Sequence, residues 1–133
     1  MNRADYERYA QAFNDRDYDA VFDHYAPGAS IRFFGVDLSD RDAFKRFYGF
    51  LHDHVIETLT IERFASGEDL VALEGIIRIE ATRDLDAATL EAQGLDQFMP
   101  IAKGEVQQMR QYIHYHLADG KFTSVGCAIV GLT

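Results

Sequence analysis

The chain has 133 residues, 47% of them hydrophobic, which is enough for one domain with a real core and too little for two. Its net charge of −9 argues against partners such as nucleic acid or an anionic membrane, because both repel an acidic surface. Cys127 is the only cysteine, so an intrachain disulfide and a thiolate-rich metal site are both excluded. We therefore expect a single domain over residues 1–133, with no metal and no cofactor.

The N-terminal segment MNRADYERYA is polar and helix-like, and it contains no apolar signal-peptide stretch. No run of the sequence approaches the ~18 apolar residues that a membrane helix needs. From these two features we expect a cytoplasmic protein that makes no membrane contact.

Three helices are predicted in the first half, because apolar residues there recur at i, i+3, i+4 and i+7. The second helix is expected to stop at Pro27-Gly28, and the third to begin with Ser39 as its cap and Asp42 as the reciprocal partner. Between them, residues 29–36 (ASIRFFGV) are typical of a short strand. The three stripes are Tyr6, Tyr9, Ala10 and Phe13; Tyr18, Val21, Phe22 and Tyr25; and Phe44, Phe47, Tyr48 and Leu51.

From Ile56 onward the pattern changes to the alternation that is typical of strands. ETLTIERF turns at Ser66-Gly67 into LVALEGIIRIEAT, and VQQMRQYIHYHL turns at Asp119-Gly120 into KFTSVGCAIVGL. An Asp-Gly pair between two alternating runs is a strong hairpin signal. Helices followed by antiparallel strands predict an α+β fold, with the helices against one face of a curved sheet.

Two segments leave alternatives open. The irregular stretch 84–104 is either a lid or binding loop, or a surface excursion with one short helix. In residues 109–117, strict alternation places His114 and His116 opposite the apolar side chains, on the face that carries Arg110. We favour a solvated or subunit-contact surface for this histidine pair over a metal site, which would need further carboxylate ligands.

The order of these elements, and above all RYAQAFNDRDYDAVFDHYAPGASIRFFG (residues 8–35), resembles the nuclear transport factor 2-like superfamily. Within it, the chain is most similar to the SnoaL-like polyketide cyclases and the ketosteroid isomerases, and residues 8–35 align with the latter without a gap. The resemblance implies a cone-shaped curved antiparallel sheet closed by three N-terminal helices, with an apolar internal cavity. It also implies a homodimer through the outer sheet face.

The functional residues of these families carry over only in part. The ketosteroid isomerase oxyanion donor falls on Tyr9, backed by Tyr25 and Tyr48, whereas the general-base aspartate falls on Phe33 and the second donor near Ile113. The catalytic set of the limonene epoxide hydrolases would fall near Gly75, Ile77 and Cys127, and the aspartate of scytalone dehydratase lies nearest to Asn14. The usual catalytic carboxylates are therefore replaced.

The best remaining candidates for proton transfer are His52 and Asp53, at the expected cavity mouth, since imidazole suits proton transfer near neutral pH. The alternative is an ordinary polar helix terminus. With Tyr9 as the donor, these three form the predicted catalytic set. The predicted ligand-binding set is Phe13, Asn14, Phe33, Tyr48, Ile77, Met109, Ile113, Tyr115 and Cys127.

Two functions follow from this reading. The first is an isomerase, dehydratase or cyclase for a small apolar, ring-containing molecule, in which Tyr9 or Tyr115 polarises a carbonyl and His52 or Asp53 moves a proton. The second is a non-catalytic ligand-binding or dimeric assembly module. Fold alone does not choose between them.

Overall fold

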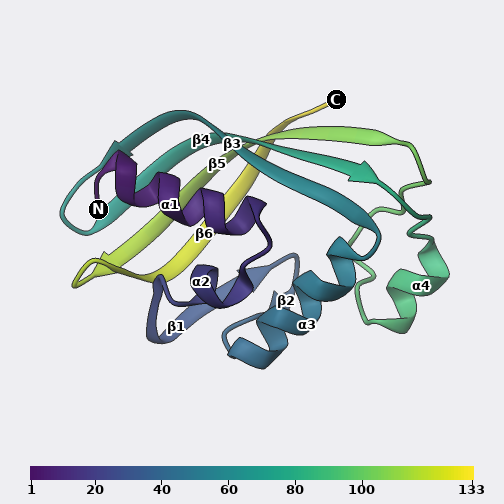
Figure 1. The fold of residues 1–133 in the computed structure, drawn as a ribbon, viewed down its shortest axis with the longest axis horizontal. Helices are drawn as coiled ribbons and strands as arrows, with labels where there is room; N and C mark the ends of the chain where they lie inside the picture. The colour runs from purple at the N-terminus through teal and green to yellow at the C-terminus, as the bar shows by residue number, and fades with distance from the viewer.

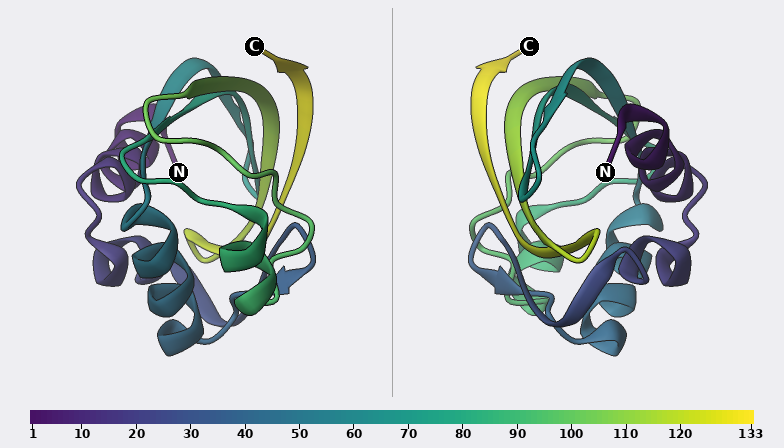
Figure 2. Two further views of the ribbon diagram at one scale, coloured as in Figure 1. Left: turned by 90° about the vertical axis from the view of Figure 1, so that its right-hand side faces the viewer. Right: turned by 90° about the vertical axis from the view of Figure 1, so that its left-hand side faces the viewer.

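A strongly curved six-stranded sheet, not closed into a barrel, forms the framework of the protein, and helices cover its open side (Figures 1 and 2). The computed structural model describes residues 1–133. Strands follow the order β2-β1-β6-β5-β4-β3. The predicted α+β fold, with its curved sheet and N-terminal helices, is confirmed.

Three helices precede the long strands, as the apolar stripes predict. They are α1 (Arg3–Asn14), α2 (Tyr18–Phe22) and α3 (Arg41–His52), and each buries residues of its stripe. The cap of α3 differs from the prediction: Asp40 accepts the Ala43 N–H, while the Ser39 hydroxyl accepts the N–H of Ile31 instead. The end of α2 also differs, because Tyr25 pairs with Phe122 and so begins a strand before Pro27 is reached.

The sheet consists of one short hairpin and four long strands. Antiparallel pairing joins each long strand to the next, and the predicted turn at Asp119-Gly120 is present, with φ of 52° and 77°. The expected antiparallel pairing is wrong for one pair of strands, because β1 runs parallel to β6. The strands are β1 (Tyr25–Phe33), β2 (Val36–Asp37), β3 (Val55–Ser66), β4 (Leu70–Ala81), β5 (Val106–Ala118) and β6 (Lys121–Leu132).

Side chains of β5 alternate between buried and exposed along its second half. Ile113, Tyr115 and Leu117 are buried, whereas His114 and His116 are exposed, which confirms the predicted orientation of the histidine pair. No group of three or more potential metal ligands gathers anywhere in the chain.

Between β4 and β5, residues 84–104 pack against the end of the sheet and include the short helix α4 (Ala87–Ala92) (Figure 1). A two-residue bridge joins Leu85 to Ile101, and Leu90 and Leu95 are buried. The segment is thus anchored at both ends and contributes to the core. None of the helices is long and apolar enough to cross a membrane.

Candidate functional site

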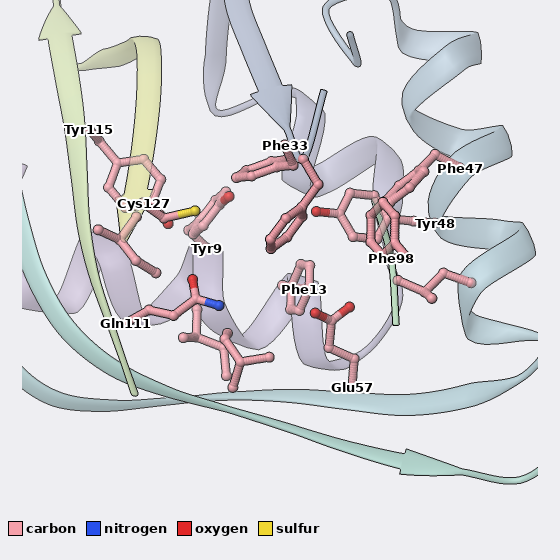
Figure 3. Close-up of a pocket in the computed structure, with 15 residues that line it drawn as sticks. Tyr9, Phe13, Phe33, Phe47, Tyr48, Glu57, Phe98, Gln111, Tyr115 and Cys127 are labelled. Carbon is pink, nitrogen blue, oxygen red and sulfur yellow. The ribbon is translucent and has the colours of Figure 1, made fainter. Parts of the chain in front are cut away.

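A cavity of about 80 Å³ lies between α1, α3 and the inner face of β3–β6 (Figure 3). Thirteen of its fifteen lining residues are hydrophobic. The lining consists of Tyr9, Phe13, Phe33, Phe34, Phe47, Tyr48, Leu51, Glu57, Leu59, Ile77, Phe98, Gln111, Ile113, Tyr115 and Cys127.

Glu57 is the only carboxylate in this lining. It lies on β3 between the buried residues Val55 and Leu59, so strand alternation turns its side chain toward the apolar interior. The side chain is only 12% exposed, and Figure 3 shows the carboxylate beside Phe13, pointing into the cavity. A charge in such a place needs a partner, because desolvating an ionised carboxylate is costly.

The partner is His52, the last residue of α3. Its Nε2 lies 2.9 Å from Glu57 Oε1, and its Nδ1 lies 2.7 Å from the hydroxyl of Tyr18. The imidazole is 2% exposed, so it is held between these two groups away from solvent. Because a carboxylate oxygen accepts, Nε2–H donates to Glu57, and the Tyr18 hydroxyl is the hydrogen-bond partner of Nδ1. His52 therefore orients Glu57 from behind and leaves Oε2 free toward the cavity.

Two further polar groups face the cavity without any protein partner. The Tyr48 hydroxyl and the Gln111 amide point inward (Figure 3). Neither is sealed off from the cavity, because no fully buried side-chain nitrogen or oxygen in the protein lacks a hydrogen-bond partner. Burial, and then the nearby charge of Glu57, raise the pKa of Tyr48 well above its usual value. Tyr48 thus remains a hydrogen-bond donor at neutral pH.

A cluster of phenols borders the other end of the cavity. The hydroxyls of Tyr9 and Tyr25 lie 3.0 Å apart, and those of Tyr6 and Tyr115 lie 2.8 Å apart. Burial raises the pKa of all four phenols, so none ionises near neutral pH. The pairing of Tyr9 with Tyr25 agrees with the resemblance to ketosteroid isomerases, but Tyr48 stands apart from that pair.

Most of the predicted site residues are brought together. Of the two predicted sets, eight line the cavity: Tyr9, Phe13, Phe33, Tyr48, Ile77, Ile113, Tyr115 and Cys127.

The other four lie elsewhere. Asn14 clamps the edge strand, with its amide bonded to both the N–H and the C=O of Leu59, and is not part of the lining. Met109 borders an adjacent pocket, and Asp53 is exposed at the C-cap of α3. His52 lies behind the wall and reaches the cavity only through Glu57.

The site residues predicted from the sequence do not include Glu57, because for the strand ETLTIERF only the bounds, and not the two faces, are predicted. The signal was present: Val55, Glu57 and Leu59 share one face, so a single carboxylate stood among inward-facing apolar residues. Tyr18 carried no such signal, because its contact with His52 depends on how α2 packs against α3.

Solved structures with this fold are similar to the chain at low sequence identity. A putative polyketide cyclase from Xanthomonas campestris pv. campestris matches with 22% identity and a TM-score of 0.70, covering 91% of this chain and 84% of its own. A protein with a ketosteroid isomerase-like fold from Catenulispora acidiphila, in complex with trimethylamine, matches with 11% identity and a TM-score of 0.69, covering 96% and 86%. A computationally designed 17-OHP binder matches with 14% identity and a TM-score of 0.65, covering 96% and 91%.

No significant match was found among curated proteins. The family model of the SnoaL-like domain matches residues 6–125, which is most of the chain. The protein therefore belongs to the SnoaL-like family, within the nuclear transport factor 2-like superfamily.

Proposed function

We propose that the protein binds a small ring-containing carbonyl compound in this cavity and catalyses proton transfer on it, with Glu57 as the acid–base group. The observation that carries the proposal is a single carboxylate in an otherwise apolar lining, oriented by a buried histidine. Residues with these properties in a cavity are typical of general acid–base sites.

The polar groups of the cavity suit the two ends of such a reaction. Glu57 Oε2 would remove a proton from the carbon next to the carbonyl, and the electron pair of that C–H bond would move onto the carbonyl oxygen. The resulting oxyanion would accept hydrogen bonds from the Tyr48 hydroxyl and the Gln111 amide, which have no other partner. Donors already in place, at low dielectric, stabilise developing charge without having to reorganise.

Three outcomes are open to this enolate. Return of the proton from Glu57 to a different carbon gives isomerisation. Loss of a neighbouring hydroxyl, which leaves as water after taking that proton, gives dehydration. Attack of the enolate carbon on a second carbonyl in the same molecule moves the electron pair of that C=O bond onto its oxygen, which takes the proton from Glu57, and gives aldol-type cyclisation. The resemblance of the fold to a putative polyketide cyclase agrees with the last of these without selecting it.

In this proposal the roles differ from those expected from the sequence. Glu57 replaces His52 and Asp53 as the proton-transfer group, and His52 becomes a positioning residue. Tyr9, whose hydroxyl is bonded to Tyr25, is assigned to the binding wall beside Tyr115.

The test is a screen of ring-containing ketones for thermal stabilisation, followed by turnover of each hit by wild type and by Glu57→Gln. The variant keeps the shape of the side chain but cannot accept the proton, so we expect kcat to fall by about 10²- to 10⁴-fold with KM little changed. Glu62→Gln, on the exposed face of the same strand, is the matched control and should keep full activity. Equal turnover by Glu57→Gln and wild type would refute the assignment.

The second candidate is binding without chemistry. The apolar lining favours it, and the designed 17-OHP binder is a protein of this fold named for its ligand. Stabilisation of the protein by a ketone that undergoes no Glu57-dependent change would select this alternative.

The outer face of the sheet supports the proposed homodimer. Tyr112 is 45% exposed there, and it borders a surface groove with Arg63, Glu74 and His114. An exposed tyrosine among opposite charges fits an interface with a second copy. Light scattering should show a dimer for the wild type and a monomer for Tyr112→Glu. A wild-type protein that is monomeric would contradict the proposed homodimer.

A further inference from the structure

The cavity is too small for the ligands that its chemistry suits. A cavity of about 150 Å³ is known to hold benzene, whereas this one measures about 80 Å³. A substituted ring therefore cannot be accommodated by the cavity alone, and part of the ligand must occupy further space.

That space adjoins the cavity. A second pocket of about 180 Å³ lies beneath the 84–104 segment, with Ile79, Ile101 and Met109 among its mainly apolar lining. The two compartments share five wall residues, namely Phe34, Leu51, Glu57, Phe98 and Gln111. Both polar groups at the junction, Glu57 and Gln111, thus face the inner cavity and the outer pocket alike.

Two aromatic rings from segments far apart in sequence line the junction. The ring centroids of Phe34 and Phe98 lie 5.1 Å apart, and Phe98 also contacts Phe47, beside which it appears in Figure 3. The side chain of Gln97 lies against Gly35, where an added Cβ would come within 2.7 Å of its amide nitrogen. The β1–β2 turn and the 84–104 segment therefore meet at this point.

Phe34 holds its place in an unfavourable backbone conformation. Its φ is 51°, a left-handed value that is uncommon for a bulky residue, and Gly35 follows at 80°. Two-residue hairpin turns of this kind prefer Asn-Gly, so a phenylalanine at the first position costs local stability. Strain of this kind persists where the surrounding structure enforces it, often beside a binding site.

This inference rests on the proposed function. We infer that the ligand spans both compartments through the Phe34–Phe98 junction, with its carbonyl group in the middle of the molecule. Glu57 and Gln111 meet the ligand at the junction, the phenol-lined cavity takes one apolar end and the outer pocket takes the other. The substrate class is a ketone, or a related oxygenated compound, flanked by ring systems on both sides. A compound with its carbonyl at one end fits poorly, because an apolar ring would then lie against Glu57.

The experiment compares binding of three probes by calorimetry. Benzophenone carries its carbonyl between two rings, 4-phenylbenzaldehyde is an isomer with a terminal carbonyl, and acetophenone has a single ring. We expect benzophenone to bind about tenfold or more tightly than either of the others. It has no hydrogen on the carbons next to its carbonyl that could be transferred as in the proposed reaction, so its binding is independent of whether Glu57 is catalytic.

Two tryptophan substitutions fill the outer pocket. Met109→Trp should lower the affinity for benzophenone about tenfold and change the affinity for acetophenone less than about twofold. The same changes in affinity are expected for Ile129→Trp, at a more exposed position of the pocket. Gln108→Trp, at an exposed position on the outer face of the same strand as Met109, is the matched control and should leave the affinity for both probes unchanged. Three results would overturn the inference. They are equal affinity for benzophenone and its isomer, no binding of benzophenone, and unchanged affinity for benzophenone in both pocket variants.

Discussion

At the scale of single residues, the contact between His52 and Glu57 determines what the cavity can do. An imidazole that is 2% exposed donates to a carboxylate that is 12% exposed, and the phenol of Tyr18 satisfies the other ring nitrogen. This hydrogen bond holds the carboxylate in one orientation within the apolar wall. His52 thus acts on the cavity by positioning Glu57 and does not itself reach the ligand.

We predict that His52→Leu lowers kcat about tenfold or more with KM little changed, because Glu57 loses the group that orients it. The measurement is kcat and KM for a ketone substrate. The same measurement on His52→Gln, whose amide can still donate to the carboxylate, should show part of the rate restored. His54→Leu is the control, because the imidazole of His54 bonds the Phe50 carbonyl instead. An unchanged kcat in His52→Leu would show that His52 does not act through Glu57.

At the scale of elements, the end of α1 is fixed to the free edge of the sheet. β3 is an edge strand, and Asn14 covers its unpaired backbone by bonding both the N–H and the C=O of Leu59, at 2.8 and 3.0 Å. Edges left uncovered invite pairing with other chains. Asn14, which was expected in the ligand site, therefore has a structural role at the edge of the sheet, outside the cavity.

We predict that Asn14→Ala lowers the free energy of unfolding by about 1–3 kcal/mol, because it leaves two backbone groups of Leu59 without their partner. The measurement is urea unfolding followed by circular dichroism. Gln11→Ala, which removes an exposed bond to Asp15 on the same helix, should cost less than about 0.5 kcal/mol. A similarly small loss for Asn14→Ala would argue against the clamp.

At the scale of the whole molecule, buried phenols connect stability to pH. Burial raises the pKa of six tyrosines above the usual value near 10, so the folded state keeps protons that the unfolded chain releases. Their contribution to stability is fully present below pH ~10 and is lost as pH rises through the folded-state pKa values. The six are Tyr6, Tyr9, Tyr18, Tyr25, Tyr48 and Tyr115.

We therefore predict that the urea concentration at the midpoint of unfolding falls steeply above pH ~10. Most of the tyrosinate absorbance should appear only as the protein unfolds. Tyr6→Phe should make the loss less steep, since one raised group is removed. Stability that stayed level while all seven tyrosines ionised in the folded state would contradict this account.

How far the sequence predicts the molecule depends on the range of the interactions. Local periodicity was sufficient for the three helices, the long hairpins and the outward face of His114 and His116. It failed where distant segments meet. Tyr25 fits the helical pattern but lies in a strand, because it pairs with Phe122, 97 positions along the chain. The cavity wall around Glu57 depends on how α3 lies against β3. Such packing is set by the whole fold, which the local pattern does not contain.

The central claim, that Glu57 transfers protons within the cavity, is tested most directly by hydrogen exchange on a bound ketone. The measurement is proton NMR in D₂O of 1,3-diphenylpropan-2-one, which carries its carbonyl between two rings and has hydrogens on both neighbouring carbons, following deuterium entry at those carbons. We predict that wild type exchanges these protons about 10²-fold faster than Glu57→Gln, with Glu62→Gln equal to wild type. Equal exchange rates for wild type and Glu57→Gln would contradict the claim.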